Sequence, residues 1–172
     1  MSEQEQKQIF DQWLSQHKGI LFKIVRAYAF TPYDQDDLFQ EIALQLWRSI
    51  PEFRGEAKAS TWIYRVALYT ASAWTRREQK QPPTEPLTAV AQTLTMMEQP
   101  SDPRVEWLYE QIAQLNPIDR SICVLMFDGF SYKEIAEIAG ISESNVGVKI
   151  HRIKQRLVNA SRNSHESLQT IA

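Results

Sequence analysis

Hydrophobic side chains recur every three or four residues along most of the chain, which is the spacing that places them on one buried face of an α-helix. In the first half this pattern predicts three helices, at about residues 9–28, 32–50 and 60–77, with Gly19 as the weak point of the first. The third helix is apolar on nearly every side, so more than one of its faces must have a partner. Its apolar residues are Trp62, Ile63, Val66, Ala67, Tyr69 and Trp74.

The same spacing resumes in the second half and predicts four shorter helices, at about residues 105–115, 117–128, 132–139 and 143–158. No stretch of either half alternates as a β-strand does. Residues that start and stop helices stand at the expected ends. They are the caps Thr31, Ser60, Asn116, Ser131 and Ser142 and the stops Gly129 and Gly140.

A proline-rich segment separates the two helical halves. Five of the 8 prolines fall between residues 81 and 103, among threonines and glutamines, which is typical of a linker. The prediction is an all-α fold with two small helical domains, 1–80 and 104–162, joined by a Pro-rich linker at 81–103 and followed by a C-terminal tail at 163–172. The second domain is expected to be a helix-turn-helix domain.

Composition narrows the classes of protein. A content of 43% hydrophobic and 23% charged residues is that of a globular chain. One cysteine, Cys123, excludes an internal disulfide, and no apolar run approaches the ~18 residues of a membrane span, so we expect a cytoplasmic protein without membrane insertion. With 19 basic and 21 acidic residues the net charge is −2, so a nucleic-acid role would need the help of another protein.

The strongest motif is the short helix, tight turn and longer helix between Tyr132 and about Val158. Ala136 offers a small residue where two helices cross, and Gly140 permits the positive φ of the turn. The last helix then presents polar and basic side chains opposite its apolar stripe, as major-groove reading requires. These are Ser144, Asn145, Lys149, Arg152 and Arg156. The alternative is a solvated basic face on an ordinary helical hairpin.

An acidic segment at residues 36–41 is the second motif. Asp37 and Glu41 lie one turn apart on one helix face, with Asp34 and Gln40 nearby. Two carboxylates at this spacing could hold a divalent metal for phosphodiester hydrolysis, as in a small nuclease. The chain has no second carboxylate cluster and no suitably placed histidine, and a solvated face is the simpler interpretation.

Aromatic and cationic residues alternate in the third motif, at residues 53–55 and 61–65. Such mixing suits single-stranded DNA, because bases stack on rings while Arg and Lys follow phosphates. The alternative is that Trp62 and Tyr64 are core residues. The histidines have no ligand partner at zinc spacing, and Cys123 lies beside an apolar stripe, where packing is the simpler role.

Taken in this order, residues 36–47, 53–67 and 115–152 resemble the bacterial extracytoplasmic-function (ECF) sigma factors of the sigma-70 family. The resemblance covers about residues 9–80 and 104–159. It implies a non-enzymatic initiation factor that needs no cofactor and binds core RNA polymerase, through the largest-subunit clamp helices and the flap region, and promoter DNA. Few residues precede the first helix, so control is expected from a separate anti-sigma factor.

The resemblance also implies a role for individual residues. Polymerase binding falls to Asp37, Gln40, Glu41 and Leu44. Capture and melting of the minus-ten strand fall to Arg54, Gly55, Glu56, Lys58, Thr61, Trp62 and Arg65. Recognition of the minus-thirty-five element falls to Ser144, Asn145, Val148, Lys149, Arg152 and Arg156. Gly147 departs from the family pattern, which favours a polar or basic residue there. An autonomous helix-turn-helix regulator is the alternative.

Overall fold

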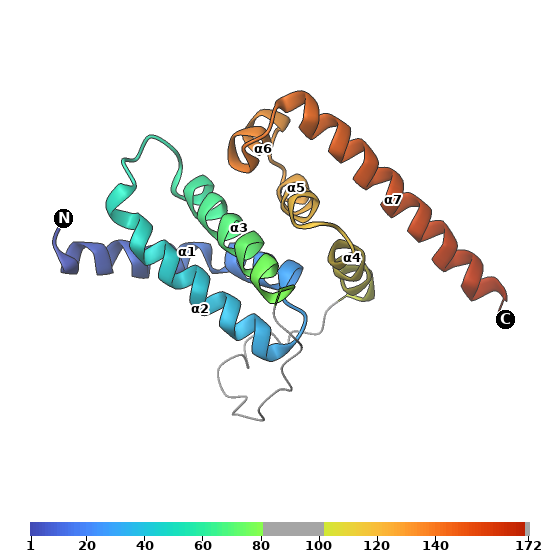
Figure 1. Cartoon of the computed structure of the whole chain (residues 1–172), viewed down its shortest axis with the longest axis horizontal. Coiled ribbons are helices and arrows are strands. Elements are labelled where there is room, and N and C mark those ends of the chain that lie inside the picture. The colour runs from blue at the N-terminus through green and yellow to red at the C-terminus, as the bar shows by residue number, and fades with distance from the viewer. Residues whose placement is uncertain (81–101, 171–172) are drawn as a thin grey trace. The chain divides into compact units, whose positions relative to one another are not determined.

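The computed structural model describes residues 1–80 and 102–170, with side chains as far as Ser164. All the regular structure in these ranges is helical, and the chain divides into two compact units with the boundary between Ser101 and Asp102 (Figure 1). The predicted all-α fold class is therefore confirmed. The first unit contains α1 (Glu3–Tyr28), α2 (Pro32–Ser49), the 3-10 helix η1 (Ile50–Glu52) and α3 (Ala59–Glu78). The second contains α4 (Pro103–Ala113), α5 (Pro117–Phe127), α6 (Tyr132–Ala139) and α7 (Glu143–Thr170).

The first unit is a bundle in which each of α1, α2 and α3 packs against the other two. The apolar stripes seen in the sequence meet at its centre, because burying them removes their surface from water. The largest side chains with almost no exposed surface are Leu21, Ile24, Tyr28, Leu38, Ile42, Leu46 and Ile63.

Two details of the first unit differ from the sequence predictions. The break in α1 falls at His17, which has a non-helical φ of −121°, and not at Gly19. Ser60 does not cap α3, because the helix starts earlier, with Lys58 at its N-cap and no side-chain cap hydrogen bond. Helix α2 ends at Ser49, close to the predicted end at about residue 50, and Pro51 follows inside the 3-10 helix η1.

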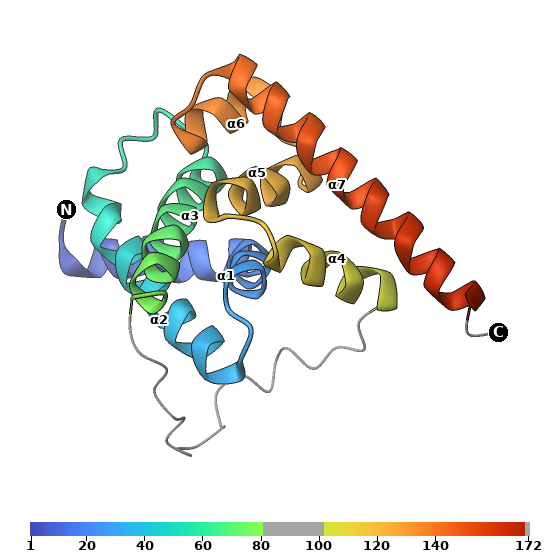
Figure 2. The same ribbon diagram turned by 45° about the vertical axis from the view of Figure 1, so that its right-hand side comes forward.

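In the second unit α5 and α6 pack against α7, and α4 packs against α5 (Figure 2). Arg120 on α5 is buried, and its guanidinium donates to the carbonyl oxygens of Leu115 at 2.8 Å and Ala113 at 2.7 Å. The last carbonyls of a helix lack partners within the helix. Arg120 therefore fixes the end of α4 to α5.

The element ends also differ from the predicted segment boundaries. Asp102 caps α4 and Pro103 is its first residue, so the last two residues of the predicted linker belong to the second unit. The rest of the linker, 81–101, lies outside the described residues. α7 continues to Thr170, through most of the predicted tail, and both views show it extending past α5 and α6 (Figures 1 and 2). Over the described ranges, no helix combines the length and apolarity needed to cross a membrane.

Candidate functional surfaces

An exposed stripe runs along α2 and carries most of the residues expected from the acidic motif. Its members repeat at helical spacing and all lie on the solvent side of the bundle, while Glu41 is half-buried at its edge. The stripe, called the α2 face below, consists of Tyr33, Asp37, Gln40, Leu44 and Arg48. Tyr33 is 69% exposed and Leu44 is 45% exposed, so the α2 face includes apolar surface that a partner could cover.

The two carboxylates at the centre of this motif contact α3. The indole N–H of Trp74 donates to Asp37 Oδ2 at 2.8 Å, and Arg77 Nη2 lies 3.5 Å from Glu41 Oε1. Both carboxylates of the acidic motif thus take part in the packing of α2 against α3. No cluster of three or more metal-binding side chains occurs in the described ranges.

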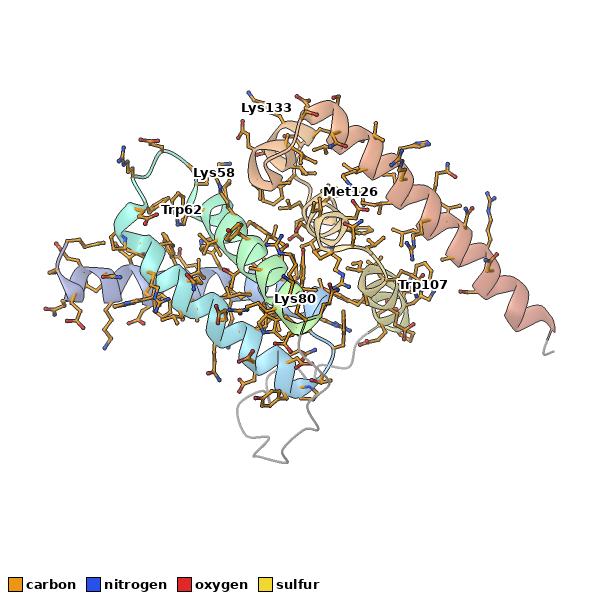
Figure 3. The ribbon with its side chains drawn as sticks, viewed as in Figure 1. Lys58, Trp62, Lys80, Trp107, Met126 and Lys133 are labelled. Carbon is orange, nitrogen blue, oxygen red and sulfur yellow. The ribbon has the colours of Figure 1, made fainter. Side chains whose placement is uncertain are left out.

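The loop between η1 and α3 exposes the residues of the third motif. Arg54, Glu56 and Lys58 are exposed, and Gly55 has a φ of 74°, in the left-handed region that favours glycine. Lys58 and Trp62 lie at the loop end of α3, and Lys80 lies beyond its other end (Figure 3). The loop thus presents cations and open backbone to solvent.

Aromatic rings hold both ends of this loop. The ring of Phe53 lies 5.2 Å from that of Trp13 on α1 and 5.6 Å from that of Trp62 on α3, measured between centroids. The Trp62 indole N–H also donates to Ser49 Oγ at 3.0 Å. Trp62 is consequently a half-buried anchor of the loop and not a freely exposed ring. The neighbouring Thr61 is half-buried too.

Farther along α3 the structure decides one open alternative and corrects one expectation about aromatic residues. Tyr64 is in the core, as the alternative interpretation held, with 3% of its surface exposed. Tyr69, expected to be buried, is 73% exposed and lies one turn beyond the exposed Arg65. Sequence reasoning missed Tyr69 because it read α3 as apolar all round. The four-residue step from Arg65 was the signal that could have found it.

The predicted helix-turn-helix is formed by α6 and α7. Ser131 and Glu134 make the capping box that opens α6, and Gly140 closes it in the left-handed conformation with φ 69°. Ile135, Val146 and Ile150 are buried between the two helices. The helix-turn-helix part of the fold prediction is therefore confirmed.

Most of the predicted recognition face is exposed, but Lys149 is not opposite the buried stripe. Its Nζ lies 2.8 Å from Asp119 Oδ1 on α5, and both side chains are only about a fifth exposed, at 22% and 21%. The expectation that Lys149 shares an open face with Asn145 is therefore wrong. The Lys149 side chain instead lies on the side of α7 that contacts α5. The exposed members of the face are Ser144, Asn145, Val148, Arg152 and Arg156.

The structure also shows the surroundings of two other residues of the second unit, Gly147 and Cys123. A Cβ atom added to Gly147 would lie 3.6 Å from the ring of Tyr132, which is an ordinary van der Waals distance, so an alanine at this position would fit against the start of α6. Burial, with a smaller contribution from the negative charge of Asp119, raises the pKa of the Cys123 thiol to about 12. Cys123 is fully buried, which fits the packing role expected from the sequence.

Comparisons with known proteins match both units. Residues 13–81 fit the family model described as Sigma-70 region 2, and residues 105–157 fit that described as Sigma-70, region 4. The chain is 32% identical over 136 residues to RNA polymerase sigma factor YlaC of Bacillus subtilis, covering 76% of this chain and 79% of that protein. It is 26% identical over 139 residues to the ECF RNA polymerase sigma-E factor of Escherichia coli K12, covering 73% of each.

Solved structures with the same fold include two complexes of such a chain with another protein. One is CnrH in complex with the cytosolic domain of CnrY, with a TM-score of 0.63, 18% identity, and coverage of 91% of this chain and 90% of that one. The other is RpoE in complex with the anti-sigma factor NepR from Bartonella quintana, with a TM-score of 0.69, 16% identity, and coverage of 89% and 96%.

Proposed function

This chain belongs to the sigma-70 family of RNA polymerase sigma factors, in its extracytoplasmic-function class, and from that premise we propose how its surfaces divide the work of transcription initiation. As a sigma factor of this class it binds core polymerase and directs promoter recognition, DNA melting and initiation. The observation that carries the proposal is that both family regions occur in order and that each exposes a separate polar surface suited to one of these partners.

The α2 face is the proposed docking surface for the clamp helices of the polymerase largest subunit. Asp37, Gln40 and Leu44 are exposed at successive turns, and Glu41 stands at the edge. Carboxylates beside an exposed apolar side chain fit a basic partner that also buries some apolar surface. Docking on polymerase also explains how a chain of net charge −2 can act at DNA, because the polymerase supplies much of the cationic surface that binds the DNA.

The loop after η1 is the proposed minus-ten surface. Arg54 and Lys58 offer cations to the strand backbone, and the open backbone at Gly55 leaves room for an unstacked base. Glu56, Thr61, Trp62 and Arg65 complete this surface. Because Trp62 packs against Phe53, its proposed contribution is to hold the loop in shape as well as to offer the edge of its ring.

The exposed face of α7 is the proposed surface for the minus-thirty-five element. Ser144, Asn145 and Val148 lie near the start of the helix, where base edges are reached, and Arg152 and Arg156 lie farther along, where phosphates are nearer. Lys149 contributes less directly because it pairs with Asp119. The same unit is proposed to contact the polymerase flap region.

Three further properties complete the proposal. The protein acts without catalysis of its own, and it works in the cytoplasm, where core polymerase is found. We also propose control by a separate anti-sigma factor, supported by the solved sigma factor RpoE, whose structure was determined in complex with the anti-sigma factor NepR. Such a partner would cover the polymerase-binding surface in the absence of the inducing signal.

Run-off transcription tests the proposal. Purified core polymerase is incubated with genomic fragments that include the region upstream of this protein's own coding sequence, with and without the protein. Transcripts with discrete starts are expected only when both proteins are present. The alternative of an autonomous helix-turn-helix regulator predicts binding to a two-fold operator without polymerase and no dependence of core polymerase on the protein for initiation.

A further inference from the structure

The residues proposed to bind polymerase are not all independent of the rest of the bundle. Two of them, Asp37 and Glu41, contact the last turns of α3, through Trp74 and Arg77 respectively. These two contacts differ in kind. Trp74 is 5% exposed and donates one neutral hydrogen bond, whereas Arg77 is exposed and offers a positive charge.

A neutral donor fixes a carboxylate without cancelling its charge. The Trp74 N–H occupies one acceptor site on Asp37 Oδ2, while a carboxylate offers about four. Because the indole ring is packed in the core, its N–H points from a rigid position, and the exposed Asp37 side chain loses freedom that it would otherwise lose when a partner binds. The negative charge remains available to that partner.

We propose that Trp74 is a positioning residue for polymerase binding, which holds the Asp37 carboxylate in the orientation that the clamp helices meet. The α2 face would then be a composite surface whose geometry depends on α3, although Trp74 itself touches no partner. This inference rests on the proposed role of Asp37. It assigns no such role to Arg77, whose 3.5 Å contact with Glu41 is exposed and would compete with a basic partner.

The test is a double-mutant cycle on the affinity of the full chain for core polymerase, with Trp74→Phe and Asp37→Ala alone and combined. Trp74→Phe keeps an aromatic ring but removes the donor. We expect it to weaken core binding on the order of tenfold, the scale of one hydrogen bond to a charged group. In the Asp37→Ala background the same change should have almost no effect, because the carboxylate it orients is gone.

Matched variants separate positioning from general damage to the bundle. Trp13→Phe makes the same change at an equally buried tryptophan, also 5% exposed, that contacts Phe53 and not α2 carboxylates. It should leave core affinity unchanged. Benzothienylalanine at position 74 preserves the shape of the indole and replaces its N–H with sulfur, so it should weaken binding as Trp74→Phe does even if the phenylalanine variant folds poorly. Arg77→Gln should not weaken binding.

Each contrary result has a distinct meaning. If Trp74→Phe and the benzothienyl variant weaken binding by the same factor with and without Asp37, Trp74 acts through the bundle and the inference is wrong. Unchanged binding by both variants would overturn it as well. If Asp37→Ala alone leaves core affinity unchanged, the proposed polymerase surface fails, and the role of Trp74 fails with it.

Discussion

The two units carry their exposed polar side chains in different ways. On α7 most of the recognition face lies opposite the buried stripe, so the same helix packs with one side and offers the other to solvent. In the first unit the candidate residues also hold the bundle together, since Asp37 bonds to Trp74, and Trp62 bonds to Ser49. Substitutions in the second unit should therefore separate function from stability more cleanly than those in the first.

The largest expected effect is a charge reversal on the α2 face. Asp37→Lys combined with Glu41→Lys should weaken core binding by roughly 4 kcal/mol, because like charges would meet across the interface. Unlike a purely exposed pair, it should also lower the free energy of unfolding by about 1–2 kcal/mol, since Trp74 loses its acceptor. Pull-down of core polymerase and urea denaturation measure the two effects.

The control for that reversal is Glu3→Lys with Asp11→Lys, two exposed acids on α1. It changes the net charge equally and should leave core binding intact. Normal core binding by a folded Asp37→Lys, Glu41→Lys variant would remove α2 from the interface.

The next effect concerns the stability of the second unit alone. Arg120→Ala removes the donor to two carbonyls at the end of α4 and should destabilise this unit by about 3 kcal/mol. Hydrogen exchange followed by mass spectrometry reports each unit separately. Protection should fall in α4 and α5 and persist in α1 to α3, while the exposed Arg152→Ala should change neither. Equal loss of protection in both units would show that they do not unfold independently.

A smaller effect distinguishes two residues of α7. Asn145→Ala should cost roughly 1–3 kcal/mol at one or two positions of the minus-thirty-five element and relax the preference there. Lys149→Ala should leave the preferred sequence unchanged and instead lower stability by about 1 kcal/mol, because its partner is Asp119. Holoenzyme bound to a promoter library measures the first, and thermal unfolding the second. A change of base preference with Lys149→Ala would contradict this assignment and show that Lys149 takes part in base recognition.

The smallest effects come from two glycines in opposite situations. Gly55→Ala forces an L-residue into positive φ and should cost about 1 kcal/mol while impairing promoter opening. Gly147→Ala lies in a helix with ordinary contact distance to Tyr132 and should stabilise by about 0.5–1 kcal/mol. Thermal unfolding of both variants is the measurement. Stabilisation by Gly55→Ala would mean that the loop does not keep this conformation in solution.

Sequence periodicity predicted the helices and the helix-turn-helix because these depend on residues three or four positions apart. The contacts that it missed join distant positions. Trp74 and Asp37 are 37 residues apart, and Lys149 and Asp119 are 30 apart, so no local pattern could pair them. The exposure of Tyr69 was missed for a related reason, since hydropathy does not reveal which side of a helix the bundle leaves open.

Permanganate footprinting on a promoter fragment tests the central claim most directly, because it detects unpaired thymines in the minus-ten region. With core polymerase and this protein together, reactive thymines should appear near the transcription start, and neither protein alone should produce them. Arg54→Ala with Lys58→Ala should reduce this reactivity on duplex DNA more than on a pre-melted template. Thymine reactivity that is the same with core polymerase alone, or protection by this protein without polymerase and without opening, would contradict the claim.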